Sequence, residues 1–276
     1  ALYVVATPIG NLGDITLRAL EVLNGVDVIA AEDTRNTRHL LQHHGIGDAK
    51  LLALHQHNER GAAERISALL QQGQSVALVT DAGTPAVSDP GALLVEAVRD
   101  AGFRVIPIPG ASAGVAALSA SGLAAPHFLF YGFLPNKSGA RRTALEALAQ
   151  QDCTLVFYEA PHRIVECTAD LLAVFGGERE IVFARELTKL FEHIHRCKLG
   201  EAPDWLNSDP NNQRGEFVLL LSGAPENHSA LDAEAERVLT LLLAELPLKQ
   251  AVQLAVQITG QPKNALYQKA LALKPA

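Results

Sequence analysis

The chain has 276 residues, of which 48% are hydrophobic and 19% are charged, and its formal net charge is −7. This length suits two ordinary domains or one large α/β domain, and the composition excludes disordered, collagen-like and disulfide-rich proteins. The acidic balance does not mark the whole chain as a nucleic-acid binder. Apolar runs are far shorter than the roughly 18 residues of a membrane span, and the N-terminus lacks the basic and apolar regions of a signal peptide. We therefore expect a cytoplasmic protein that contacts no membrane.

Short β-branched runs alternate with amphipathic helical stretches in the first half of the chain. This alternation predicts a mostly parallel sheet with helices on its faces. Gly45, Gly73 and Gly102 follow three of the helices, where a C-cap requires positive φ. The predicted strands are Leu2–Ala6, Val26–Ala30, Ser75–Val79 and Arg104–Ile108, and the predicted helices are Thr16–Leu23, Thr37–His44, Glu59–Gln72 and Ala92–Ala101.

A second pattern begins after Pro109-Gly110. Small residues at 111–120 predict a helix packed closely against a neighbouring element or a ligand, and we expect the domain change near 111–125. The last three strands have short connections, which predicts antiparallel pairing in a mixed sheet. The predicted strands are Phe128–Tyr131, Thr154–Tyr158, Glu180–Ala184, Glu192–Cys197 and Glu216–Ser222, and the helices are Gly139–Gln150 and Arg163–Phe175.

The end of the chain is purely helical. Leu231–Glu245, Lys249–Thr259 and Lys263–Leu273 are the predicted helices, and the two joined through Thr259-Gly260 resemble a helix-turn-helix element. Residues 247–276 contain four lysines and no acidic residue, unlike the acidic remainder. The predicted division is an α/β domain at 1–115, a second α/β domain at 116–225 and a small helical domain at 226–276.

Cysteine and histidine patterns do not predict a metal site. Cys153, Cys167 and Cys197 are odd in number and form no Cys-x-x-Cys pair, which indicates buried thiols in a reducing compartment. Histidines alternate at 55 and 57 and at 193 and 195, so each pair shares one face of a strand, but no third ligand is in register. We therefore expect no bound metal.

Loops that follow the predicted strands are the expected ligand sites, because ligands of open α/β sheets bind beyond the carboxyl ends of the strands. None of these loops has a Gly-x-Gly-x-x-Gly or Gly-x-x-x-x-Gly-Lys pattern, which disfavours NAD and P-loop chemistry. At 31–37, the structural interpretation is a helix cap formed by Asp33 or Thr34, and for Thr34 we favour this interpretation over a functional role. For Glu32 and Arg35, which belong to the same loop, contact with a substrate is the alternative to a structural role. The loop at 79–91 is the most distinctive, since it is too long and too rich in Asp, Pro and Gly for a mere connection.

Six motifs occur in order along the chain. Together they resemble the bacterial 16S rRNA cytidine 2′-O-methyltransferases of the tetrapyrrole-methylase superfamily, over essentially the whole chain. The resemblance implies two α/β domains with S-adenosylmethionine in the cleft between them, and a homodimer. The motifs are Thr-Pro-Ile-Gly-Asn-Leu-Gly-Asp-Ile-Thr at 7–16, Ala-Glu-Asp-Thr-Arg at 31–35, Asp-Ala-Gly-Thr-Pro at 81–85, Tyr-Gly-Phe-Leu-Pro at 131–135, Tyr-Glu-Ala-Pro-His-Arg at 158–163 and Arg-Glu-Leu-Thr-Lys at 185–189.

The resemblance also implies which residues hold the cofactor. They come from loops in both α/β domains. The tetrapyrrole enzymes of the superfamily carry Gly-Gly-Asp-Pro where this chain has Thr-Asp-Ala-Gly-Thr-Pro at 80–85, and this departure argues against a tetrapyrrole substrate. The implied cofactor-binding residues are Pro8, Asp81, Gly83, Thr84, Pro85, Ser112, Ala113, Tyr158, Gly215 and Glu216.

Methyl transfer to a ribose hydroxyl is an in-line displacement, in which the protein aligns the reacting atoms and helps to remove a proton. Glu32, Asp33, Glu159, Glu186 and Lys189 lie near the predicted cleft, although each has an alternative role as a structural ion pair. Our hypothesis is that Glu186 or Lys189 assists deprotonation, with Glu32 as a further candidate catalytic residue.

Contact with 16S rRNA or the small ribosomal subunit is expected at a basic loop and at the C-terminal helices, with the anionic remainder turned away. Arginine suits this contact because it binds phosphate through paired hydrogen bonds. DNA is not an expected partner. The predicted RNA-binding residues are Arg35, Lys137, Arg141, Arg142, Arg163, Lys249, Lys263 and Lys269.

Two alternatives stay open at this point. One is methyl transfer to a tetrapyrrole or another small molecule. The helical tail and the absence of Gly-Gly-Asp-Pro argue against this alternative. The other is a non-catalytic RNA-binding protein of ribosome assembly that uses an inherited fold, against which the density of ordered loops at strand ends speaks. Transfer of label from S-adenosylmethionine to subunits, to free rRNA or to a porphyrinogen separates them.

Overall fold

The computed structural model describes residues 1–47, 49–55, 58–124, 126–224 and 233–273. Internal contacts divide the chain into two compact units, residues 1–224 and residues 225–276. None of the helices within the described ranges is long and apolar enough to cross a membrane. The three predicted domain ranges stay a prediction, and Leu231, the expected start of a helix, lies outside the described residues.

The first sheet has the strand order β3-β2-β4-β1-β5, and every neighbouring pair is parallel. Strands β2 and β4 are buried along their whole length, as expected where helices cover both faces of a parallel sheet. Strand β3 was not predicted, because three residues at an edge carry too little pattern. The strands are β1 (Leu2–Val5), β2 (Val28–Ala31), β3 (Leu51–Ala53), β4 (Val76–Val79) and β5 (Val105–Ile108).

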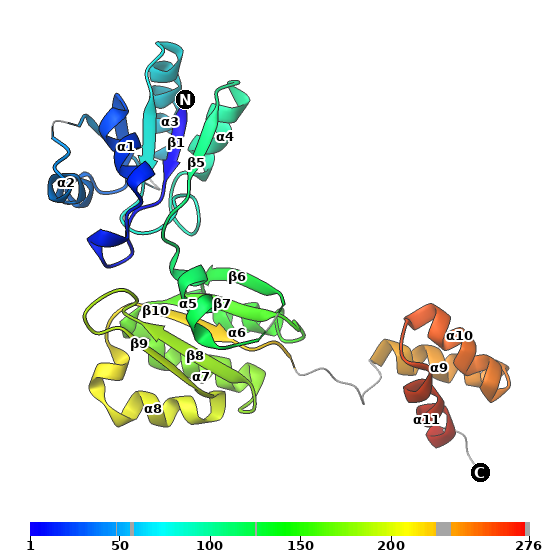
Figure 1. Cartoon of the computed structure of the whole chain (residues 1–276). Helices are drawn as coiled ribbons and strands as arrows, with labels where there is room; N and C mark the ends of the chain where they lie inside the picture. The colour runs from blue at the N-terminus through cyan, green and yellow to red at the C-terminus, as the bar shows by residue number, and fades with distance from the viewer. Residues whose placement is uncertain (48, 56–57, 125, 225–232, 274–276) are drawn as a thin grey trace. The chain divides into compact units, whose positions relative to one another are not determined.

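Two helices cover each face of this sheet (Figure 1). Helices α1 (Leu17–Gly25) and α2 (Thr34–His43) pack on one face, and α3 (Glu59–Gln71) and α4 (Ala92–Asp100) on the other. A short 3-10 turn, η1 (Leu12–Asp14), precedes α1. The predicted C-caps are confirmed, since φ is 69°, 82° and 79° at Gly45, Gly73 and Gly102.

The second sheet is mixed, with the order β6-β7-β10-β8-β9. Strand β6 is parallel to β7, while β10 is antiparallel to β7 and β8, and β8 is antiparallel to β9. The predicted mixed sheet is therefore confirmed, but the predicted short connection before the last strand is wrong. That connection contains α8 (Ala202–Ser208) between the turns η3 (Leu199–Glu201) and η4 (Pro210–Gln213), which are too short to show helical periodicity. The strands are β6 (Phe128–Phe133), β7 (Thr154–Glu159), β8 (Glu180–Arg185), β9 (His193–Lys198) and β10 (Phe217–Leu221).

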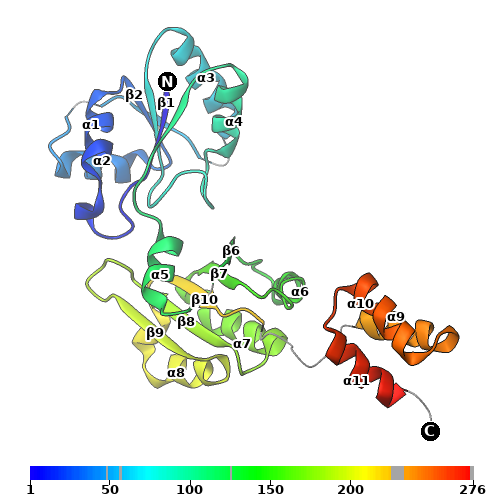
Figure 2. The same cartoon turned by 45° about the vertical axis from the view of Figure 1, so that its right-hand side comes forward.

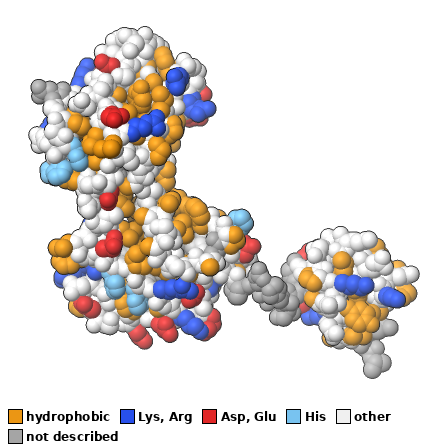
Figure 3. Space-filling view, viewed as in Figure 1, with side chains coloured by type: hydrophobic (Ala, Val, Ile, Leu, Met, Phe, Trp, Pro, Cys, Tyr) orange, Lys and Arg blue, Asp and Glu red, His pale blue; other side chains and the backbone are white. Residues whose placement is uncertain are grey.

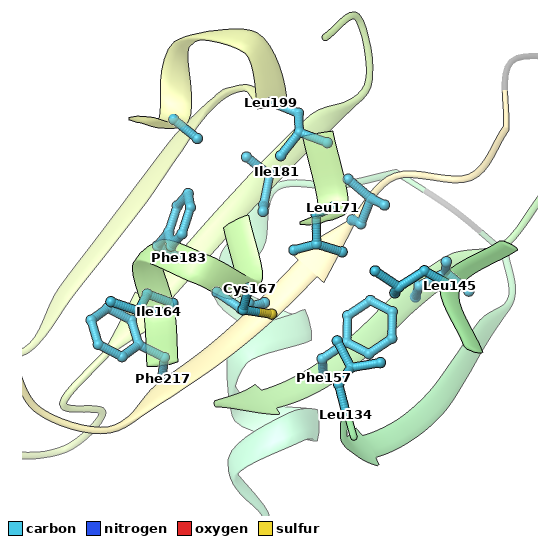
Figure 4. Packing of buried hydrophobic residues seen from close by; sticks show 14 of the residues in the cluster. Leu134, Leu145, Phe157, Ile164, Cys167, Leu171, Ile181, Phe183, Leu199 and Phe217 are labelled. Carbon is cyan, nitrogen blue, oxygen red and sulfur yellow. The ribbon is translucent and has the colours of Figure 1, made fainter. Parts of the chain in front are cut away.

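Helix α5 (Ala113–Ser121) lies on one face of the second sheet, and α6 (Ser138–Glu146), α7 (Ile164–Phe175) and α8 lie on the other (Figures 1 and 2). The close packing predicted for the small residues of α5 is confirmed: Ala117 is fully buried, and a Cβ at Gly114 would lie 3.5 Å from Phe130 and Tyr158. On the opposite face, Phe157 and Cys167 belong to the core cluster that fixes α7 against the sheet (Figure 4).

The C-terminal unit contains α9 (Ala233–Glu245), α10 (Leu248–Thr259) and α11 (Lys263–Leu273). Their buried side chains form a small core of their own, in which Leu239, Val252 and Leu266 are at most 1% exposed. Gly260 ends α10 with φ of 70°, in the turn between the two helices that were predicted to form a helix-turn-helix element. Described by itself, this unit is a three-helix bundle.

Candidate functional site

Two cavities lie side by side at the carboxyl ends of the first sheet's strands. The large cavity, of about 330 Å³, is lined by loops that follow strands of the first sheet and by strands and loops of the second sheet. The small cavity, of about 240 Å³, is lined by the first sheet's loops and by α2. Pro8 and Asp81 line the small cavity, while Pro85 and Gly215 line neither. The predicted cofactor residues that line the large cavity are Gly83, Thr84, Ser112, Ala113, Tyr158 and Glu216.

The loop at 81–91 forms one wall of the large cavity in a strained conformation. Ala86 and Ser88 have φ of 65° and 63°, although neither is glycine. Such a conformation costs about 1–3 kcal/mol per residue and persists only where the surroundings impose it. Gly83 exchanges two backbone hydrogen bonds with Thr7, of 2.9 and 3.0 Å, and the Thr84 hydroxyl donates to the Ala111 carbonyl at 3.1 Å. These contacts hold the loop against the ends of β1 and β5.

The far end of the same loop is fixed by a buried carboxylate. Glu59, at the start of α3, accepts hydrogen bonds from the backbone N–H groups of Gly91 and Leu93, each at 2.9 Å. These N–H groups lie at the start of α4, where a helix offers no carbonyl acceptor of its own. Glu59 therefore caps a neighbouring helix and anchors the loop at its exit.

Tyr158 forms the opposite wall, at the end of β7. Its hydroxyl accepts a hydrogen bond from the Gly114 N–H at 3.1 Å, and Phe130 and Phe133 contact its ring edge-to-face. Burial raises the pKa of Tyr158, so the phenol stays protonated at neutral pH. The side chain is a rigid, neutral part of the cavity wall.

A lysine between two carboxylates closes another side of the large cavity. The Lys189 Nζ lies 2.9 Å from Glu186 Oε1 and 2.7 Å from Glu216 Oε2. Burial alone would lower the pKa of Lys189, but its bonds to the two carboxylates outweigh burial, and the pKa is raised. Burial likewise opposes the effect of Lys189 on Glu186, whose pKa is lowered on balance. Both groups are therefore charged and poorly suited to accept a proton.

The loop that carries Lys189 is also strained and touches the β1 loop. Glu186 and Thr188 have φ of 51° and 66°. A Cβ at Gly10 would lie 2.6 Å from Lys189 Cγ and 2.9 Å from the Leu187 carbonyl oxygen, so only glycine permits this approach. The loops of the two sheets therefore meet through a backbone contact at Gly10.

Acidic residues gather where the two cavities adjoin. Burial raises the pKa of Asp89 to about 6, the negative charge of Glu32 adds to this, and the Thr80 hydroxyl opposes it. Burial also raises the pKa of Glu32, against the effect of the Asp81 backbone N–H, which donates to Glu32 Oε2 at 3.3 Å. Asp89 lines the large cavity, and it is not among the residues predicted from the sequence because the recognised motif ends at Pro85. The sequence feature that could have indicated Asp89 is a second aspartate in the loop at 79–91, which was already the most distinctive loop.

A family model described as Tetrapyrrole (Corrin/Porphyrin) Methylases matches residues 1–203. The chain belongs to this family. The family resemblance inferred from the six motifs is thereby confirmed. A second model, described as RsmI C-terminal HTH domain, matches residues 229–274 of the methylase, in agreement with the predicted helix-turn-helix element.

Relatives and solved structures agree with the family. The methylase is 56% identical to the Ribosomal RNA small subunit methyltransferase I of Pseudomonas aeruginosa over 272 residues, covering 98% of this chain and 96% of that protein. It is 54% identical to the protein of the same name from Escherichia coli O157:H7, covering 98% and 94%. The crystal structure of the methyltransferase CobJ matches with a TM-score of 0.61 and 22% identity, covering 81% of this chain and 94% of that chain. The uroporphyrin-III C-methyl transferase from Thermus thermophilus, complexed with S-adenyl homocysteine, matches with a TM-score of 0.57 and 19% identity, covering 80% and 96%. The two structures show the fold.

Helix α2 of the methylase is capped by Asp33, and the preference for Thr34 is wrong. The Asp33 carboxylate accepts the Arg35 backbone N–H at 2.8 Å and pairs with the Arg35 guanidinium at 2.6 Å, while Thr34 is the first helical residue. The hydrogen bonds from Arg35 lower the pKa of Asp33 to about 2. Asp33 is thus engaged in a cap, whereas Arg35 is exposed and its contact with RNA stays a prediction.

Three of the predicted RNA-binding arginines are engaged in ion pairs with carboxylates of the same chain, and one of them is fully buried. Arg141 is 0% exposed and its Nε lies 2.6 Å from Asp170, which Arg142 also contacts at 2.6 Å. Arg163 pairs with Glu159 at 3.1 Å and donates to the Leu134 carbonyl at 2.7 Å. A buried guanidinium cannot reach phosphate, so we correct the interpretation of Arg141 as an RNA contact, and we assign Arg163 to the support of the 134–138 loop. Arg142 keeps a half-exposed side chain beside its partner.

The predicted lysines lie at the surface or near it. Lys137, Lys249 and Lys263 are exposed, whereas Lys269 pairs with Glu236 at 2.6 Å. On the visible face of the C-terminal unit, basic side chains lie beside hydrophobic ones (Figure 3). Across the described ranges, no cluster of three or more His, Cys, Asp and Glu side chains is arranged to hold a metal ion. His195 instead stacks on Trp205, with ring centroids 4.2 Å apart, and His57 lies outside the described residues.

Proposed function

We propose that this methylase uses S-adenosylmethionine to methylate the ribose 2′-hydroxyl of a cytidine in 16S rRNA, near the decoding centre of the small ribosomal subunit. The large cavity carries the proposal, because it gathers six of the expected cofactor residues from loops of both sheets. The names of the relatives and the helix-turn-helix match support an rRNA acceptor. The proposal includes a homodimer that works in the cytoplasm.

The residues of the large cavity fit this cofactor. A volume of about 330 Å³ falls in the usual range for small-molecule sites. Gly83, Ser112 and Ala113 leave room along one side, and Ile9 and Leu187 offer apolar contacts to a nucleoside. The carboxylates that line the cavity suit a ligand with a positively charged sulfonium and amino group. When bound, the cofactor supplies an electrophilic methyl group.

Asp89 is the side chain of this cavity best suited to take the hydroxyl proton. A pKa of about 6 leaves its carboxylate mostly ionised at pH 7 or above, yet more basic than an ordinary aspartate. Glu186 and Lys189, our candidates from the sequence, have pKa values shifted away from this task. We therefore assign them to holding the cavity wall, and we propose that Asp89 accepts the proton on a carboxylate oxygen.

Label transfer tests the proposal. Wild-type protein is supplied with methyl-labelled S-adenosylmethionine and one of three acceptors: small subunits lacking the modification, free 16S rRNA, or a porphyrinogen. We expect label on an RNA acceptor, at the 2′-oxygen of one cytidine, and none on the porphyrinogen. Label on the porphyrinogen alone, or cofactor binding without any transfer, contradicts the proposal.

A further inference from the structure

The small cavity adjoins the large one across a thin divide. Pro8 lines the small cavity and Ile9 the large one, and Asp81 lines the small cavity while Ala82 lines the large one. Consecutive residues on each of two chain segments therefore line the two cavities and form the divide between them. A ligand with two linked parts can place one part in each cavity, over this divide.

A buried hydroxyl in the small cavity forms no well-aligned hydrogen bond. Thr80 is 2% exposed and lines the cavity, and its Oγ1 makes no hydrogen bond of normal geometry among the described residues, although it faces the Asp89 carboxylate and opposes the rise in the pKa of that group. Its carbonyl, by contrast, accepts the Thr7 hydroxyl at 3.0 Å. Because a buried polar group without a partner costs stability, such a group in a cavity wall points to a ligand.

The Asp81 carboxylate beside it retains acceptor capacity. One oxygen accepts the Asp33 backbone N–H at 3.2 Å and the other accepts the Asn36 side-chain amide at 3.0 Å. A carboxylate has about four lone-pair positions, so further donors can bind. These bonds also orient the carboxylate at the wall of the small cavity.

The charge around the small cavity selects among ligands. Glu32 and Asp81 lie together, and the only arginine beside them in the loop at 31–37, Arg35, is paired with Asp33. Asp81 is the carboxylate that lines this cavity, together with His39, and it favours a group that offers N–H donors. The volume of about 240 Å³ suits one planar ring with its linkage rather than a tetrapyrrole.

We propose that the small cavity holds the base of the target nucleotide, turned out of the RNA stack, with an amino-bearing edge facing Asp81 and Thr80. Enzymes that act inside structured nucleic acids extrude the target nucleotide in this way, and carboxylates accept from the amino group of cytosine. The ribose then lies over the divide, with its hydroxyl toward the large cavity and Asp89. This inference rests on the proposed function, and it makes Pro8 and Asp81 base contacts rather than cofactor contacts.

Asp81→Asn and Thr80→Val test the base pocket, with Glu96→Gln, at an exposed acid of α4, as the matched control. Each protein is assayed on subunits that carry C or U at the target position, and its affinity for RNA fragments with the same two bases is measured separately. We expect both variants to lose about 10- to 100-fold in kcat/KM on C and to narrow the preference for C over U, as for one lost base contact. The control keeps wild-type values, and the Kd for S-adenosylmethionine stays within twofold in all proteins.

Different outcomes separate this inference from the proposed function. Normal methylation with an unchanged preference for C in both variants overturns the base pocket and leaves the proposed function intact. A large rise in the cofactor Kd of Asp81→Asn also overturns it, because the small cavity would then belong to the cofactor site. A wild type that methylates neither RNA, yet binds the C fragment more tightly than the U fragment through Asp81, supports the base pocket and contradicts the proposed function.

Discussion

The loops at 81–91 and 185–192 are alike in backbone and differ in charge, since the first contains two acids and no basic residue and the second contains two of each. Each contains two non-glycine residues with positive φ, and each lines the large cavity. In the second loop, Lys189 is neutralised by two carboxylates. In the first, burial and the nearby negative charge of Glu32 raise the pKa of Asp89 to about 6. The difference indicates that one loop accepts the proton and the other is locked by ion pairs, so conformation alone does not identify the catalytic side.

Asp89→Asn should have the largest effect. The amide keeps the shape of the side chain but cannot accept the hydroxyl proton, so we expect kcat to fall about 10²–10⁴-fold. Single-turnover methylation of small subunits measures this loss. Asp100→Asn, at the exposed end of α4, is the matched control and should keep wild-type turnover. A kcat within threefold of wild type for Asp89→Asn would remove this residue from the chemistry.

Gly10→Ala should push the loop after β1 away from the loop at 185–192 without changing any charged group. Its Cβ would meet the Leu187 carbonyl oxygen at 2.9 Å, and backbone cannot yield as a flexible side chain does. We expect a loss of about 1–3 kcal/mol in the free energy of unfolding, measured by urea denaturation. Gly61→Ala in α3 is the control: nothing lies within 4 Å of its Cβ, so the gain in helix propensity should leave stability equal or higher. Equal stability of the Gly10→Ala variant and wild type would contradict the close approach.

Lys189→Met tests whether the second loop is locked by charge. Without the cation, the carboxylates of Glu186 and Glu216 repel each other, and the cavity wall should loosen. We expect the Kd for S-adenosylmethionine to rise about tenfold, measured by calorimetry, and Lys189→Arg to recover most of the affinity because arginine keeps the charge. If Lys189 were instead the base, Lys189→Arg would bind the cofactor normally and fail in turnover. Lys50→Ala, at an exposed lysine, is the control.

The smallest effect concerns stability against pH. The folded-state pKa of Asp89 is about 6 and the unfolded value is 3.8, so the folded protein binds the proton more tightly. The stabilisation by the protonated side chain is therefore lost as pH rises from about 4 to 6. We expect Asp89→Asn to be more stable than wild type by about 1 kcal/mol at pH 7.5 and equal to it near pH 4, a modest value because the side chain is only half buried. A constant difference between pH 4 and 7.5 would contradict the raised pKa.

Local features of the fold were predictable, and long-range pairings were not. Gly45, Gly73 and Gly102 mark helix ends because a C-cap depends on the chain only within a few residues. Strand β3 and helix α8 were not predicted, because segments of three and seven residues are too short to show a clear periodicity. The six motifs identified the family, and with it the fold.

The site was predictable only where motifs reach it. Arg141 is a surface cation by composition, and only its pairing with Asp170, 29 residues further along, places it in the interior. Gly10 meets Leu187 and Lys189 across two sheets, which no local pattern indicates. Burial and the charge of Glu32 raise the pKa of Asp89, so its proposed role depends on the folded loop rather than on the residue type.

The pH dependence of kcat/KM for methylation of small subunits tests the contrast between the two loops most directly, because kcat/KM reports groups of the free enzyme. For the wild type we predict a rate that rises with pH through about 6 and then levels off, following the pKa of Asp89. Asp89→Asn should lack this step, while Lys189→Arg should retain it. A step near pH 6 that survives in Asp89→Asn would contradict the account.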